Sequence, residues 1–360
     1  MHIVLLADPI DNQNGGIHYY CVNSLKAILE ANTKHKITII KETSKSFHPK
    51  ANIIARKRNH GLIREFLSIP QIVKRLNPDI VVEMAHFGPF NLPDSIKRVT
   101  VIHDLTPISH PQWHKSQSPP AHKIFLPLIL KNAHAIITPS VSTCADLYKY
   151  YPVSINKTQC IYLGAESMFT PTKDPVFIEK YQLETPYFLH IGTFEPRKDH
   201  LTLLAAYQKY RENKGAVKKL ILIGGTGWKS KKIHKAIESH PFKNEIEILG
   251  FVDRTELPTL LTQCHGFIFP SLYEGFGLPL LEAMSCGAPC IVSRNSSLTE
   301  VGGDDAMYFQ TGNSKELANK MKKLENPALR NSLKKVALKQ SMNFSWEFHS
   351  TAFFKLVELL

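Results

Sequence analysis

The segment SLYEGFGLPLLEAMSCGAPCIVS, residues 271–293, places two carboxylates, Glu274 and Glu282, around a glycine-rich turn and a helix start. Pro279 fits the first turn of a helix, where its missing N–H is not needed. The amides of residues 275–278 then gather at a helix N-terminus, which attracts phosphate. We expect Glu274 on the loop and Glu282 within the first helical turn, both facing one cleft. This arrangement favours hydrogen bonds to the hydroxyls of a sugar nucleotide over a paired-acid site.

Apolar strand patterns alternate with helical patterns in both halves of the chain. The strand candidates are HIVLLA, KITII, DIVVEMA, RVTVIHD and AIITPS, and after residue 186 YFLHIG, KLILIGG, EIEILGF, GFIFPS and PCIVS. Such alternation predicts parallel sheets covered by helices on both faces. We therefore expect an α/β protein with two domains in tandem, residues 1–165 and 166–343. The stretch 165–186, with three prolines, forms the linker and first turn of the second domain.

Composition fits a two-domain globular protein of 360 residues with 43% hydrophobic content. The opening MHIVLLAD lacks the basic region and cleavage site of a signal peptide, and no apolar run reaches the ~18 to 20 residues of a membrane span. The six cysteines show no C-x-x-C spacing. They are interpreted as reduced, buried thiols, which predicts a cytoplasmic location.

The net charge of +13 implies attraction to anions. Basic residues gather at Lys41, Lys45, Lys50, Arg56, Lys57, Arg58 and Arg64, interrupted by Ile53, Ile54, Leu62, Ile63, Phe66 and Leu67. This pattern suits peripheral contact with the inner face of a membrane or with a lipid-linked acceptor. The alternative is a solvated loop and helix face. Nucleic acid is the least favoured partner, because no recognition motif accompanies the charge.

Four further motifs accompany the 271–293 segment: VIHDLTPISHP (101–111), FLHIGTFEPRKDH (188–200), LILIGGTGW (220–228) and ILGFVDRTELPTLL (248–261). In order and spacing the chain resembles family 4 of the retaining glycosyltransferases, whose signature is two glutamates separated by seven residues. The resemblance implies the GT-B fold, in which two Rossmann-like domains with parallel sheets face a central cleft. It further implies that the C-terminal domain binds the donor, that the N-terminal domain binds the acceptor, and that a final helix, about 344–360, returns to the first domain.

Arg197 and Lys198 follow an apolar strand and place two cations at the mouth of the second domain. Fixed cations there would stabilise the charge of a departing nucleoside diphosphate, and the resemblance implies that both bind the pyrophosphate. Thr193 stands where some relatives carry another arginine. Glu195 is interpreted as a structural partner of this loop.

Gly15 and Gly16 follow the first strand and let backbone amides approach an anion. A plain turn is the alternative, and the resemblance favours a contact with the diphosphate or the transition state. His103, with Asp104, ends the strand RVTVI. A lone histidine is usually a core residue, but the resemblance implies contact with the donor sugar near the reacting carbon. The expected route is front-face displacement, with the leaving phosphate taking the acceptor's proton.

The resemblance assigns the remaining donor contacts. Glu282 would bind the ribose and Glu274 the sugar hydroxyls. Backbone groups would serve the sugar at Phe276, Gly277 and Leu278 and the nucleobase at Gly250, Phe251 and Val252. GGTGW (224–228) lacks the ending of a triphosphate loop and is interpreted as a strand-to-helix turn. Neither a D-x-D motif nor a histidine–cysteine cluster occurs, so we expect no metal and no cofactor.

These observations predict an enzyme that transfers a hexose, with retention, from a nucleotide sugar to a glycan or lipid-linked acceptor of a cell-surface polysaccharide. GDP-mannose is the favoured donor and UDP-glucose the next. The alternatives are a sugar-nucleotide 2-epimerase of the same fold and a non-catalytic, membrane-associated scaffold. The presence of Glu274, Lys198 and His103 in one chain favours the active transferase.

Overall fold

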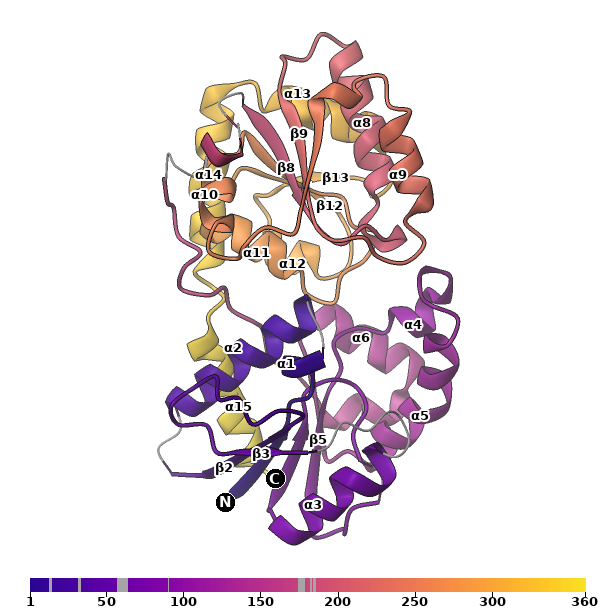
Figure 1. The fold of residues 1–360 in the computed structure, drawn as a ribbon, viewed down its shortest axis with the longest axis vertical. Helices are drawn as coiled ribbons and strands as arrows, with labels where there is room; N and C mark the ends of the chain where they lie inside the picture. Colours follow the sequence, from indigo (N-terminus) through magenta and orange to yellow (C-terminus); the bar gives the residue numbers. More distant parts are fainter. Residues whose placement is uncertain are drawn as a thin grey trace. The chain divides into compact units, whose positions relative to one another are not determined.

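The computed structural model describes residues 1–12, 15–31, 34–56, 64–89, 91–173, 179–181, 183 and 186–360. The chain divides into two compact units. The N-terminal unit comprises Met1–Gly164 and Ser345–Leu360, and the C-terminal unit comprises Ala165–Phe344. Each contains a twisted sheet with helices on either side of its strands (Figure 1).

The described part of the N-terminal unit holds a seven-stranded, fully parallel sheet of order β3-β2-β1-β4-β5-β6-β7. Its strands are β1 His2–Leu6, β2 Lys36–Lys41, β3 Ile53–Ala55, β4 Ile80–Glu83, β5 Lys97–Val101, β6 Ala135–Thr138 and β7 Thr158–Cys160. The central strands are buried along almost their whole length, as expected for a parallel sheet covered on both faces.

Helices of the N-terminal unit begin where the sequence supplies proline, serine or glycine. They are α1 Pro9–Asn12, α2 Gly16–Ala31, the π-helical turn η1 Arg64–Ser68, α3 Ile69–Leu76, α4 Thr106–Ser109, η2 Pro111–Trp113, α5 Ser118–Asn132, α6 Val141–Tyr150, η3 Pro152–Lys157 and α15 Trp346–Val357. The C-terminal helix α15 belongs to this unit because His349 bonds both Ser24 of α2 (2.8 Å) and the carbonyl oxygen of Tyr162 (2.9 Å).

The described part of the C-terminal unit holds a six-stranded parallel sheet of order β10-β9-β8-β11-β12-β13. Its strands are β8 Tyr187–Ile191, β9 Lys219–Ile223, β10 Ile246–Gly250, β11 Gly266–Phe269, β12 Cys290–Ser293 and β13 Met307–Phe309. The helices are η4 Pro196–Lys198, α8 His200–Glu212, α9 Lys231–Glu238, η5 Lys243–Glu245, α10 Leu257–Gln263, α11 Leu278–Ser285, α12 Leu298–Gly302, α13 Ser314–Lys323 and α14 Pro327–Ser341. A core of aromatic and aliphatic side chains packs α8, α9 and α13 onto this sheet.

The strand order places the ligand-binding edge of each sheet. The order reverses between β1 and β4 in the N-terminal unit and between β8 and β11 in the C-terminal unit. Ligands of such folds bind beside the carboxyl ends of the strands at this reversal. These topologies confirm the prediction of two Rossmann-like units with parallel sheets.

The cysteines agree with the sequence interpretation as reduced and mostly buried thiols. All six cysteines are free thiols, of which five are buried and Cys160 is half-buried. Among the described residues, no helix is both long and apolar enough to cross a membrane.

Candidate active site

The loops after β8 and β11 bring three predicted site residues together, although 76 residues separate Lys198 from Glu274. The Nζ of Lys198 donates to Oε1 of Glu274 at 2.5 Å, and a guanidinium nitrogen of Arg197 donates to Oε2 at 2.5 Å. We call Arg197, Lys198 and Glu274 the C-unit cluster. Arg197 also donates to Glu195 at 2.9 Å and to the carbonyl oxygen of Tyr273 at 3.0 Å. Glu195 is thus a partner of this loop.

Backbone geometry fixes the two cations of the C-unit cluster at the start of α8. Pro196 opens the short helix η4, and Asp199 ends it with a left-handed backbone (φ 50°). The Asp199 side chain then accepts from the amide of Thr202 and caps α8. The amide of Leu272 donates to the carbonyl oxygen of Arg197 at 2.8 Å, which ties this turn to the loop after β11.

Two serines that the sequence analysis did not single out hold Glu274 in place. The amide of Glu274 donates to Oγ of Ser296 at 3.0 Å. Ser297 donates from Oγ to the carbonyl oxygens of Glu274 (2.8 Å) and Phe276 (2.9 Å). The run of small polar residues 295–297 after β12 could have indicated these contacts, since serine and asparagine side chains commonly form hydrogen bonds with nearby backbone groups.

The C-unit cluster is charged at neutral pH. Glu274 is only 6% exposed, and its burial acts to raise the pKa of its carboxyl. The charges of Arg197 and Lys198 outweigh this effect and lower the Glu274 pKa to about 2. Burial and the neighbouring Arg197 lower the pKa of Lys198, which Glu274 opposes. A carboxylate that accepts hydroxyl hydrogen bonds therefore lies directly beside two cations that can hold an anion.

Glu282 lies one residue further along α11 than predicted, just beyond the first turn. Gly277 is the N-cap, with a left-handed backbone (φ 105°), and Leu278 is the first helical residue. Glu282 is therefore the fifth residue of the helix, in its second turn, because the helix starts at Leu278 and not after it. Its buried carboxyl accepts from Arg254. Burial raises the pKa of Glu282, and the charge of Arg254 opposes the shift.

The residues expected near the nucleobase lie at the end of β10. Gly250 adopts φ +68°, and no atom lies within 4 Å of the position that a Cβ would take there. Phe251 is 82% exposed, whereas Val252 is buried. The amide of Gly224 donates to the carbonyl oxygen of Gly250 at 2.9 Å, so the GGTGW stretch is a turn against this strand end, as predicted. Thr193 is exposed on the loop after β8.

Three predicted site residues belong to the N-terminal unit. Gly15 adopts φ +115° and Gly16 is the first residue of α2, with open space around both. His103 follows β5 and bonds the carbonyl oxygen of Met84 through Nε2 at 2.9 Å. Its ring packs edge-to-face against Tyr20 (4.7 Å between centroids) and His86 (5.4 Å). Burial lowers the pKa of His103, so the imidazole is neutral at pH 7.

The structure divides the basic stretch predicted to face a membrane into buried and exposed residues. Lys41 is 1% exposed and pairs with Asp11 at 2.9 Å, and Arg56 is buried against Asp8. Arg64 donates to Asp8 at 2.5 Å and to Glu83 at 3.1 Å. These side chains turn inward because they pair with carboxylates: Asp8 and Asp11 follow β1, and Glu83 ends β4. Lys45 and Lys50 are exposed, whereas Lys57, Arg58, Leu62 and Ile63 lie outside the described residues.

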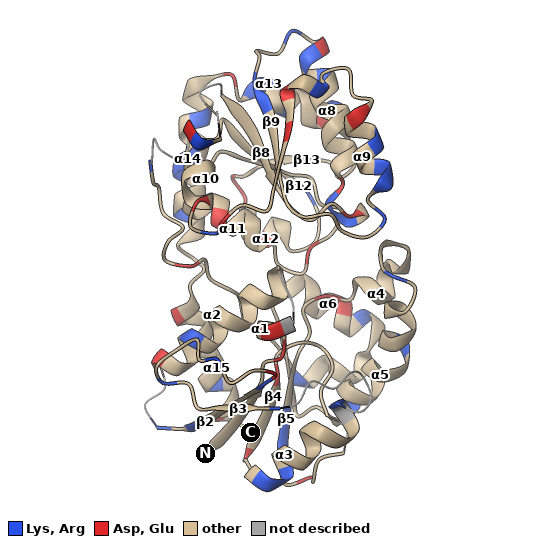
Figure 2. Ribbon diagram, in the orientation of Figure 1, with Lys and Arg blue, Asp and Glu red and all other residues tan. Residues whose placement is uncertain are grey.

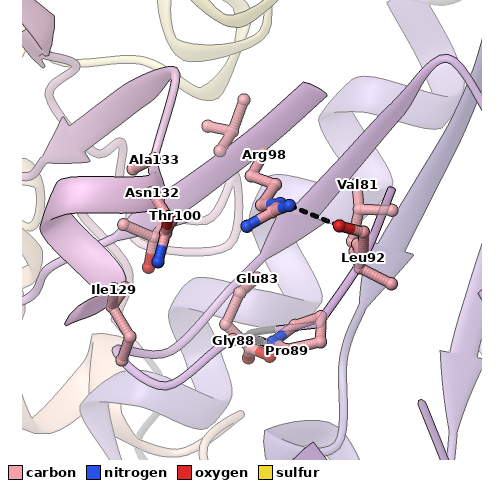
Figure 3. Close-up of a pocket in the computed structure, with 11 residues that line it drawn as sticks. Val81, Glu83, Gly88, Pro89, Leu92, Arg98, Thr100, Ile129, Asn132 and Ala133 are labelled. Carbon is pink, nitrogen blue, oxygen red and sulfur yellow. Dashed lines mark hydrogen bonds between the residues drawn. The ribbon is translucent and has the colours of Figure 1, made fainter. Parts of the chain in front are cut away.

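We call Asp8, Arg56, Arg64 and Glu83 the N-unit cluster. Burial raises the pKa of Glu83 to about 7; Arg64 opposes this shift and Asp8 adds to it. A hollow beside Glu83 is lined by Arg98, Thr100 and Asn132 among others, with Arg98 donating to the carbonyl oxygen of Leu92 at 2.6 Å (Figure 3). None of the predicted site residues lines it. Outside the clusters, charges of both signs are spread over both units (Figure 2).

Comparison with known proteins gives matches along almost the whole chain. The family model described as Glycosyltransferase Family 4 matches residues 15–167, and the model for Glycosyl transferases group 1 matches residues 175–340. The chain is 29% identical to O-antigen chain mannosyltransferase B of Escherichia coli, over the full length of both. It is 28% identical to the serotype-specific mannosyltransferase WbdA of the same species, over 80% of this chain and 38% of that protein. The Anabaena protein HepE, solved in complex with UDP-glucose, has the same fold, with a TM-score of 0.77 at 17% identity over 100% of both chains.

Proposed function

We propose that this chain, which belongs to the glycosyltransferases through both of its units, transfers mannose from GDP-mannose, with retention, to a glycan or lipid-linked acceptor in polysaccharide assembly. The observation that carries the proposal is the C-unit cluster. Two cations and one ionised carboxylate meet at the strand-order reversal of the sheet, where such folds bind ligands. A nucleotide sugar needs both kinds of group, cations for its diphosphate and an acceptor for its hydroxyls.

The proposed chemistry uses the C-unit cluster in the departure of the nucleotide. Arg197 and Lys198 hold the diphosphate and stabilise the charge that grows on it as the bond to the anomeric carbon breaks. The acceptor oxygen forms its bond on the same face of the sugar, and the acceptor proton passes to the departing phosphate oxygen. Glu274 accepts hydrogen bonds from the sugar hydroxyls. The step needs no metal and no cofactor.

The other predicted site residues keep their expected roles in the proposal. Glu282 binds the ribose, and backbone groups of residues 250–252 meet the nucleobase. Residues 276–278 present backbone amides to the sugar. In the N-terminal unit, Gly15 and Gly16 serve the diphosphate and His103 the donor sugar. The neutral imidazole of His103 suits a hydrogen-bonding role better than that of a charged group.

Mannose is favoured over glucose because two curated relatives, at 28–29% identity, carry mannosyltransferase names. UDP-glucose stays the second candidate, since the similar HepE structure holds that donor. A donor screen with purified protein decides between them: we expect release of GDP from GDP-mannose in the presence of an oligomannose acceptor. Proton NMR of the product should show the α-anomer, as retention requires. If the protein turns over neither donor, the proposed function is contradicted. A β-linked product contradicts retention.

The proposal includes peripheral contact of the N-terminal unit with the cytoplasmic face of a membrane, through the exposed Lys45 and Lys50. Each lysine near an anionic surface contributes about 1 kcal/mol of attraction. Double substitution by alanine should reduce co-sedimentation with vesicles containing phosphatidylglycerol at low salt. The exposed pair Lys231 and Lys235 of α9 provides the charge-matched control. Equal partitioning of both double variants and the wild type excludes this contact.

A further inference from the structure

Arg254 connects the carboxyl of Glu282 to the first residues of the C-terminal unit. It lies in the connection between β10 and α10 and donates to Oε1 of Glu282. Its Nε donates to Glu166 at 2.5 Å, and its guanidinium lies 4.8 Å from the ring centre of Phe169. These three contacts hold the guanidinium. Neither Arg254 nor Glu166 belongs to the site predicted from sequence.

We propose that Arg254 is a positioning residue that fixes Glu282 for the nucleoside ribose, and that Glu166 anchors Arg254 in turn. The inference rests on the proposed function, in which Glu282 binds the ribose. A carboxylate can accept hydrogen bonds at both oxygens. Because Arg254 engages Oε1, it orients the group and leaves acceptor capacity for a ribose hydroxyl.

Arg254 also favours the ionised form of Glu282. The Glu282 side chain is buried, and burial raises its pKa. The charge of Arg254 lowers this pKa, whereas the like charge of Glu166 raises it. The thiol of Cys286, one turn along α11, has a pKa that burial and Glu282 raise to about 12, so it stays neutral. Removal of Arg254 therefore leaves a buried carboxyl that takes up a proton more readily. A protonated carboxyl accepts ribose hydrogen bonds less well than a carboxylate does.

A buried ion pair can also be purely structural, and such a pair is weak evidence for any further role. The two readings differ in what they predict for nucleotide binding. A structural pair affects the unfolding temperature alone. A positioning pair also changes the affinity for nucleoside diphosphate and the pH at which that affinity is lost.

The experiment compares Arg254→Gln, Arg254→Lys and Glu166→Gln with a control, Arg294→Gln. Arg294 is exposed in the same unit, and its guanidinium lies 4.8 Å from the ring centre of Tyr308. The dissociation constants of GDP and UDP are measured by calorimetry between pH 5.5 and 8.5, alongside thermal unfolding. Arg254→Gln should bind the preferred nucleotide about tenfold or more weakly at pH 7, the loss expected for a charged hydrogen bond.

The pH profile identifies the cause of the loss. In Arg254→Gln, affinity should recover as pH rises, because the carboxyl then ionises. Arg254→Lys should lose less nucleotide affinity than Arg254→Gln, since lysine keeps the charge but not the forked geometry of the guanidinium. Glu166→Gln should lose the least affinity of the three variants. Arg294→Gln should match the wild type.

An Arg254→Gln protein with wild-type affinity and an unchanged pH profile overturns the inference. If that variant does not fold, Arg254→Lys decides by the same two readouts. Wild-type protein that binds neither GDP nor UDP contradicts the proposed function itself, and the inference with it. If the wild type binds GDP or UDP and the Arg254 variants bind it with the same affinity, only the inference is contradicted.

Discussion

The two units place buried carboxylates and cations at equivalent edges of their sheets, but the two clusters have opposite electrostatics. In the C-unit cluster two cations share Glu274, and they lower the pKa of that carboxyl to about 2. In the N-unit cluster Glu83 has one guanidinium, Arg64, and a like-charged neighbour, Asp8, and its pKa is raised to about 7. Burial acts in the same direction on both carboxyls, so the count of neighbouring charges decides the outcome.

The difference lies in the partners of one carboxyl in each cluster: two cations contact Glu274, whereas one guanidinium contacts Glu83. In the C-unit cluster two adjacent cations share Glu274, and Arg197 also pairs with Glu195. In the N-unit cluster each guanidinium faces a carboxylate of the same chain. The predictions below test this contrast.

The largest effect is expected from removal of one cation of the C-unit cluster. Lys198→Ala and Arg197→Ala should each lower kcat by about 100-fold, as measured when a group that stabilises transition-state charge is lost. Lys231→Ala on the exposed face of α9 is the matched control and should retain activity. Rates are measured at saturating donor, with folding followed by circular dichroism. Wild-type kcat in both cluster variants contradicts the diphosphate assignment.

A smaller and more selective effect should separate the two glutamates of the 271–293 segment. Glu282→Ala should weaken GDP and GDP-mannose about equally, because its proposed partner, the ribose, is common to both. Glu274→Ala should reduce turnover by about tenfold or more while changing the affinity for GDP less, since its proposed partner is the sugar. Calorimetry with GDP alone, beside steady-state kinetics, tests the division. Equal losses of GDP affinity would mean that the roles are misassigned.

The same contrast shows what the sequence could predict. Alternating apolar and helical segments predicted both sheets, and the family resemblance assigned Arg197, Lys198 and Glu274 to one donor site without predicting their mutual contacts. Those contacts follow from loops at adjacent strand ends, which the strand order places side by side. The partners Arg254 and Glu166 were missed because 88 residues separate them and no local pattern links them.

The N-terminal charge run could not be divided into buried and exposed residues from sequence for a related reason. A list of basic residues does not show which side chains lie next to a carboxylate. Lys41 ends β2 and Arg56 follows β3, so both reach the sheet edge where Asp11 and Asp8 accept from them. Lys45 and Lys50, between those strands, stay exposed. The fold, and not the composition, divides this run into buried and exposed charges.

The N-unit cluster should make stability depend on pH near neutrality. The folded pKa of Glu83, about 7, lies above its ordinary value of 4.5. Between these pH values the folded state holds a proton that the unfolded state has lost, so stability falls as pH rises. The slope is at most about 1.4 kcal/mol per pH unit. Glu83→Gln should remove this component, measured as unfolding temperature from pH 5 to 8.

Glu30→Gln serves as the control for that measurement because Glu30 is exposed on α2. It should keep the wild-type slope. A Glu83→Gln protein with the wild-type pH dependence would mean that Glu83 is ionised across this range. The contrast between the two clusters would then be lost, since Glu83 and Glu274 would share one protonation state.

The smallest effect is expected from chelation. A divalent cation in a glycosyltransferase would neutralise charge on the diphosphate, and in the proposed function Arg197 and Lys198 perform that task. EDTA should therefore leave wild-type kcat largely unchanged. Lys198→Ala makes the test sharper, because Mg²⁺ can replace part of the positive charge that this variant lacks. We expect Mg²⁺ to restore part of the kcat of Lys198→Ala and to leave the kcat of the wild type unchanged. Loss of wild-type activity in EDTA, restored by one specific divalent ion, would show that the cluster's own cations are insufficient and that a metal completes the donor site.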